Sequence, residues 1–130
     1  MNKFQIIESS QNSKIIQISS ENDLKHYLLK KAANENSIIL LESQTSGTLT
    51  IGVGDPYGFV EFINKTDPPY LIAVMGTTDT EIDTFVEFDS GGTPTPIPKF
   101  ACLPMELVVS IAIYFFNNGE LPKNVNWQEI

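Results

Sequence analysis

The chain has 130 residues, of which 42% are hydrophobic, and its 16 acidic and 8 basic residues leave a net charge of −8. This length and composition predict one folded domain over residues 1–130, and no apolar run reaches the roughly 18 residues that a membrane-spanning helix needs. All eight basic residues are lysine, and they do not form the clustered basic footprint that direct nucleic-acid binding requires.

The N-terminal part predicts two short strands and a helix. Phe4–Glu8 and Lys14–Ile18 are candidate strands around a polar turn, and no secretory apolar run precedes them, so a cytoplasmic protein is expected. Ser20 and Asp23 have the spacing of a capping box. Apolar residues then recur at helical spacing and predict an amphipathic helix over residues 21–34. These residues are Leu24, Tyr27, Leu28 and Ala32.

Five runs of strand-forming residues follow this helix. The first run, 37–42, contains four consecutive aliphatic residues and is expected to be a central strand. The other runs are 47–53, 59–63, 70–75 and 81–89. Short strands joined by brief turns are typical of an antiparallel meander. We therefore expect a meander of about five strands, with the N-terminal hairpin as a further candidate element.

The C-terminal third predicts an extended segment and a second helix. Prolines at positions 94, 96 and 98 exclude a central strand, because proline has no amide N–H to donate, so this stretch is expected to be extended at the surface. The second helix should begin at Pro104 and end at Gly119, and its nearly all-apolar circumference indicates burial on more than one side. The predicted class is α+β: an antiparallel sheet of about five strands flanked by an N-terminal helix and a buried C-terminal helix.

The glycine-rich stretch 52–58 could suggest a phosphate-binding loop, but its context argues against this function. Phosphate loops lie between a strand and a helix, whose N-terminus faces the phosphate. Here the next residues, 59–62, form another strand-like run. Gly54 and Gly58 are therefore assigned a structural role in a hairpin turn.

Cys102 and His26 are the only cysteine and histidine. Cys102 precedes the second helix, where a helix dipole can lower the pKa of a thiol. A nucleophile also needs a base, and His26 belongs to the other predicted helix. A buried structural cysteine and a surface histidine are therefore favoured. Two such ligands are too few for a Cys/His zinc site, and no catalytic, metal-binding or cofactor-binding residue is assigned.

Residues 66–98 hold six carboxylates and no lysine. The strand period places the carboxylates of 81–89 on one strand face together with an aromatic ring, and an aromatic anchor within a charged rim is typical of protein interfaces. We therefore predict an acidic face that binds a basic partner, formed by Asp79, Glu81, Asp83, Phe85, Glu87 and Asp89. The alternatives are a solvated strand face that carries no partner, Phe85 packed beneath a neighbouring strand, or a carboxylate pair acting as acid and base.

The only tryptophan, Trp127, is the fourth residue from the end of the chain. Terminal segments are usually poorly ordered unless something holds them, so an indole here predicts a tail docked on the domain. We expect the ring to pack beside the second helix and to support the fold. Replacement of Trp127 by alanine should then cost about 3 kcal/mol or more, as for a buried aromatic residue.

Three stretches together resemble one known family. They are LTIGVGDPYGFVEF at 49–62, VEFDSGGTPTPIP at 86–98 with the following Leu-Pro pair, and GELPKNVNWQE at 119–129. Their order and spacing are similar to those of the first-numbered, deaminase-inhibitor-like family of immunity proteins from bacterial polymorphic toxin systems. The chain departs from that pattern in its Asp55-Pro56 turn and in its lack of arginine.

This resemblance implies a small antidote that binds a cognate toxin domain and blocks it, and some members are paired with nucleic-acid deaminases. It carries over no catalytic residue. The acidic composition agrees with a basic, nucleic-acid-targeting toxin as the partner. A small adaptor or chaperone-like module of a secretion system is the alternative function, and a small enzyme is a third.

Overall fold

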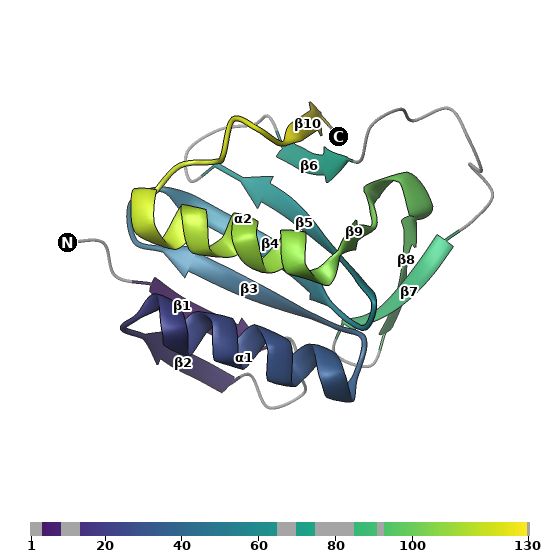
Figure 1. Cartoon of the computed structure of the whole chain (residues 1–130), viewed down its shortest axis with the longest axis horizontal. Coiled ribbons are helices and arrows are strands. Elements are labelled where there is room, and N and C mark those ends of the chain that lie inside the picture. The colour runs from purple at the N-terminus through teal and green to yellow at the C-terminus, as the bar shows by residue number, and fades with distance from the viewer. Residues whose placement is uncertain (1–3, 9–13, 65–69, 75–84, 91–92, 130) are drawn as a thin grey trace.

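The computed structural model describes residues 4–8, 14–64, 70–74, 85–90 and 93–129 (Figure 1). Ten strands in this part of the chain form a sheet in which β10-β6-β5-β4-β3-β1-β2 are successive neighbours. The strands are β1 Phe4–Glu8, β2 Lys14–Ile18, β3 Ser37–Ser43, β4 Gly47–Val53, β5 Tyr57–Ile63, β6 Tyr70–Val74, β7 Phe85–Ser90, β8 Thr93–Pro98, β9 Leu103–Pro104 and β10 Asn126–Glu129. The helices are α1 Glu21–Asn34, α2 Met105–Asn118 and the short 3-10 helix η1 Lys99–Ala101.

The expected five-stranded meander flanked by an N-terminal helix is therefore wrong. A meander does form the centre of the sheet, because β3, β4, β5 and β6 pair antiparallel in chain order. The β1–β2 hairpin extends it by pairing β1 with β3, and β10 extends it beyond β6. Two strands thus precede α1, and the sheet also contains one parallel contact, between β3 and β7.

α1 has the bounds that its end signals predict, and α2 begins one residue later than predicted, because Pro104 is its N-cap rather than its first helical residue. The Ser20 hydroxyl accepts a hydrogen bond from the Asp23 N–H at 3.1 Å and begins α1, as an N-cap residue does. α2 begins after Pro104 and ends at Gly119, whose φ of 70° is left-handed, a conformation that glycine adopts without steric cost. The two helices contact each other and cover the same side of the sheet (Figure 1).

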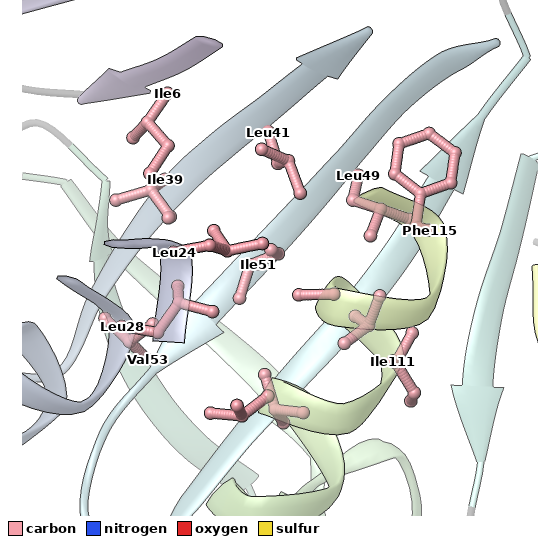
Figure 2. Close-up of a cluster of buried hydrophobic side chains, with 14 of the residues drawn as sticks. Ile6, Leu24, Leu28, Ile39, Leu41, Leu49, Ile51, Val53, Ile111 and Phe115 are labelled. Carbon is pink, nitrogen blue, oxygen red and sulfur yellow. The ribbon is translucent and has the colours of Figure 1, made fainter. Parts of the chain in front are cut away.

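The main core lies between these helices and the sheet. Alternate side chains of β3 and β4 point toward the helices, and Figure 2 shows them meeting Leu24, Leu28, Ile111 and Phe115. The strand residues in this layer are Ile39, Leu41, Leu49, Ile51 and Val53. Because strand side chains alternate between faces, the intervening residues of the same strands point to the opposite side of the sheet.

A second core covers one part of that opposite side. The β7–β8 hairpin and η1 pack there, and the Phe88 ring meets the Phe59 ring edge-on with centroids 5.0 Å apart. The other buried members are Ile38, Ile72, Val74, Ile97, Ala101 and Cys102. The rest of this side is not covered by any described element, and we call it the open face. Its residues from β3, β4 and β5 are Leu40, Glu42, Thr48, Thr50, Glu61 and Ile63.

Candidate protein-interaction surfaces

The described half of the predicted acidic face lies on β7. Glu87 and Asp89 are exposed and Phe85 keeps 51% of its surface exposed, so Phe85 is not packed beneath a neighbouring strand. The alternate residue Phe88 is only 1% exposed and anchors the strand in the second core. Asp79, Glu81 and Asp83 lie outside the described residues.

β7 is held by its neighbours in a fixed position. The Asp89 N–H donates to the Asn36 carbonyl oxygen at 2.9 Å, and Asp89 is in register with Ser37 at the start of β3. On its other side, β7 pairs with β8 along its whole length. The hairpin therefore presents the Phe85, Glu87 and Asp89 side chains from a paired strand rather than from a loop.

The proline pattern gives β8 an edge that disfavours further strand pairing. Pro94, Pro96 and Pro98 stand opposite Asp89, Glu87 and Phe85. The Asp89 N–H points away from β8, to Asn36, so its partner Pro94 also lies at a position whose amide faces away from β7. Alternate residues of a strand direct their N–H groups to the same side, so all three missing donors fall on the side away from β7. Among the described strands β8 pairs only with β7, which confirms that these prolines exclude a central strand. The hairpin is consequently suited to present its face to a partner, not its edge.

The open face ends in a hollow of about 680 Å³. Its lining includes several amide side chains, and the Gln5 amide donates to the Glu42 carboxylate at 2.8 Å, while Gln17 donates to Gln5 at 3.1 Å. Thr48, Ile63 and Asn64 complete the side that adjoins β5. The hollow is open and polar, so it is suited to a polar segment of a partner better than to an enclosed small molecule.

Sequence patterns did not single out Glu61, the most unusual group of the open face. Burial raises the pKa of this carboxyl group above its usual range. No hydrogen bond or ion pair joins it to another residue of the part of the chain that the structure describes. In the sequence, Glu61 is recognisable only as a single carboxylate within the apolar run 59–63, and an ordinary exposed position of a strand has the same pattern.

Cys102 and His26 are not brought together. Cys102 lies in the second core, where its thiol donates toward the carbonyl oxygens of Ile97 and Pro98 at 3.8 and 3.5 Å. Burial raises the pKa of this thiol, and the charge of Lys99 only partly offsets the effect, so little nucleophilic thiolate forms near neutral pH. His26 is exposed on α1, across the sheet from this core.

One further group of polar contacts has a structural role, because it connects a helix to the sheet. The Tyr27 hydroxyl donates to Glu8, and Lys31 pairs with Glu8 at 3.5 Å and with Glu35 at 2.9 Å. Burial alone would lower the pKa of Lys31, but its bonds to Glu35 and Glu8 raise it. This network joins α1 to β1. Among the described residues no group of three His, Cys, Asp or Glu side chains could hold a metal ion, and none of the described helices is long and apolar enough to cross a membrane.

Trp127, Gly54 and Gly58, which were predicted to have structural roles, lie in close contact with neighbouring segments of the fold. Trp127 is in β10 opposite Ala73 of β6, where its half-buried ring packs on the main core and its N–H donates to the Pro122 carbonyl oxygen at 3.2 Å. A Cβ atom at Gly58 would overlap the Gly52 carbonyl oxygen, and one at Gly54 would meet the Asn36 side chain and the Tyr57 carbonyl.

A comparison with protein families gives a match over most of the chain. The family model described as Immunity protein Imm1 matches residues 13–129. This span runs from β2 to β10 and includes both helices, the acidic face and the open face. No curated protein matches the chain.

Proposed function

Because this chain belongs to the Imm1 family of immunity proteins, we propose that it binds one cognate toxin domain, basic in character, and blocks it by occupying its surface. An immunity protein acts by binding, so the features that matter are exposed and complementary to the partner. The basic character of the toxin is our inference from the charge of this chain.

The β7 surface is the single observation that carries the proposal. It combines an exposed aromatic ring, Phe85, with the exposed carboxylates Glu87 and Asp89 on a paired strand. Aromatic anchors within a polar rim supply much of the binding energy of protein interfaces. Carboxylates around the ring attract and orient a basic partner. The whole-chain charge of −8 has the same sign.

A toxin that acts on nucleic acid fits this surface best. Such an enzyme needs a basic groove for the phosphate backbone, and an acidic inhibitor can cover that groove by charge complementarity. A nucleic-acid deaminase is one toxin of this kind. The antidote would act in the cytoplasm of the cell that makes it, where the toxin would otherwise meet nucleic acid.

Co-expression tests the proposed function. The toxin domain encoded next to this gene should stop growth when induced alone, and cells that also produce this chain should survive. Purified together, the two proteins should form a tight complex in which the toxin has no activity. Cell death despite abundant folded protein would contradict the proposal, whereas binding without inhibition would favour an adaptor or chaperone-like module of a secretion system.

A further inference from the structure

Glu61 occupies the middle of β5 on the open face. In the strand register its neighbours across the sheet are Thr50 on β4 and Ile72 on β6. Along β5 its neighbours on the same face are Phe59 and Ile63. Directly opposed side chains in a sheet come within about 5 Å of each other at Cβ, so these residues form the immediate surroundings of the carboxylate. None of them is charged.

The carboxylate of Glu61 lacks the compensation that the other partly buried carboxylates have. Glu42, also on the open face, accepts a hydrogen bond from Gln5 at 2.8 Å, and Glu8 is bonded to Tyr27 and Lys31. For Glu61 there is no such partner within the described residues, and burial is the sole cause of its raised pKa. Strands β1, β3, β4, β5 and β6 contain no lysine, so the central strands offer this group no cation.

A half-buried charge without a counter-charge destabilises the free protein. A cation delivered by a partner would remove that cost and form a charge-assisted hydrogen bond. The apolar residues beside Glu61 suit such a side chain, because Ile63 and its cross-strand neighbour Tyr70 are 36% and 47% exposed. Apolar surface of this kind packs well against the aliphatic stem of lysine or arginine.

We propose that Glu61 receives a lysine or arginine side chain of the toxin, and that the open face around it is a second toxin-binding surface besides β7. This inference rests on the proposed immunity function and names the chemistry of the partner at this point. The hollow beside it supports an occupant longer than one side chain. Ile63 borders both Glu61 and the hollow, and the Glu42 carboxylate and the amide oxygens of the lining can accept hydrogen bonds from a basic segment.

The test is the substitution Glu61→Gln, which removes the charge and keeps the shape. Its matched control is Glu120→Gln, which removes the same charge from an exposed carboxylate in the segment after α2. Binding of each full-length variant to the purified toxin domain is measured by calorimetry. We expect Glu61→Gln to weaken binding by about 30-fold or more, as loss of one partner of a desolvated charge pair does. The control should stay within about twofold, because an exposed surface charge outside both proposed surfaces contributes little.

Thermal unfolding of the free variants distinguishes a binding role from a structural one. Without a desolvated charge, Glu61→Gln should melt at a higher temperature than the unsubstituted protein while it binds less tightly. Unchanged affinity would overturn the inference, and so would weaker binding accompanied by a lower melting temperature, which would indicate a structural role. If the unsubstituted protein itself fails to bind the toxin, the proposed function is wrong, an outcome separate from either of these.

Discussion

At the scale of single residues, Trp127 helps to hold the C-terminal tail against the domain. Its ring packs on the main core from β10, next to Ala73 of β6, and its N–H bonds the Pro122 carbonyl oxygen within the same tail. The ring is only partly buried, so it contributes less than a fully enclosed aromatic residue. The tail is therefore held by strand pairing and by this ring together.

Replacement of Trp127 by alanine should lower the free energy of unfolding by about 2 kcal/mol, less than a fully buried tryptophan would lose. Replacement by phenylalanine keeps most of the apolar contact and removes only the hydrogen bond, so it should cost about 1 kcal/mol. Urea unfolding measures both values. Toxin affinity should not change, and an unaltered unfolding midpoint with lost toxin binding would instead place Trp127 in the interface.

At the scale of elements, the start of α2 is joined closely to the start of β5. The short strand β9 pairs Leu103 with Gly58, and the Met105 N–H donates to the Pro56 carbonyl oxygen at 3.0 Å. A Cβ atom at Gly58 would overlap the Gly52 carbonyl oxygen and stand 3.1 Å from a methyl group of Val108. Only glycine allows this approach of helix and strands without displacement of the backbone.

Gly58→Ala should therefore destabilise the protein by about 3 kcal/mol or more, because the clash involves backbone that cannot move aside cheaply. Gly119→Ala is the control. It forces alanine into a left-handed conformation at the end of α2, which should cost about 1 kcal/mol. Chemical denaturation of the two variants gives the comparison, and equal small losses would show that the β5–α2 contact can relax.

At the scale of the whole molecule, charge should set how quickly the partner is found. The net charge is −8, and exposed carboxylates on β7 stand beside an exposed aromatic ring. Long-range attraction of this kind acts on the association rate more than on the lifetime of the complex. The β7 surface and Glu61 should thus have different kinetic roles, the first in association and the second in dissociation.

The double reversal Glu87→Lys and Asp89→Lys should lower the association rate constant for the toxin by about tenfold at low salt and weaken its salt dependence. The control reverses Glu120 and Glu129, which changes the net charge by the same amount at another exposed site. Stopped-flow measurements over a range of salt concentrations would compare the two. Equal slowing by both variants would mean that only net charge matters and that β7 has no special position.

The sequence alone predicted those helix ends and strands whose position depends on interactions between residues close in the chain. Ser20 and Asp23 set the start of α1, Gly119 ends α2, and the short runs of strand-forming residues within 37–63 predict neighbouring antiparallel strands. The prolines of β8 restrict it to an edge because each lacks a donor, whatever surrounds it. The three motifs between residues 49 and 129 also indicated the immunity family, which the match over residues 13–129 shows.

Only the tertiary structure decided how many strands the sheet has and which surface is left uncovered. β1 pairs with β3 through residues such as Ile6 and Leu41, and β10 pairs with β6 through Trp127 and Ala73. A local pattern can indicate that a segment is a strand, as it did for Phe4–Glu8, but it does not identify a partner that is distant in sequence. The environment of Glu61 has the same origin, because its burial and its lack of a partner depend on neighbours from β4 and β6. The local sequence pattern determines to which face of the sheet a side chain points, whereas the packing of segments distant in sequence determines which residues surround that side chain.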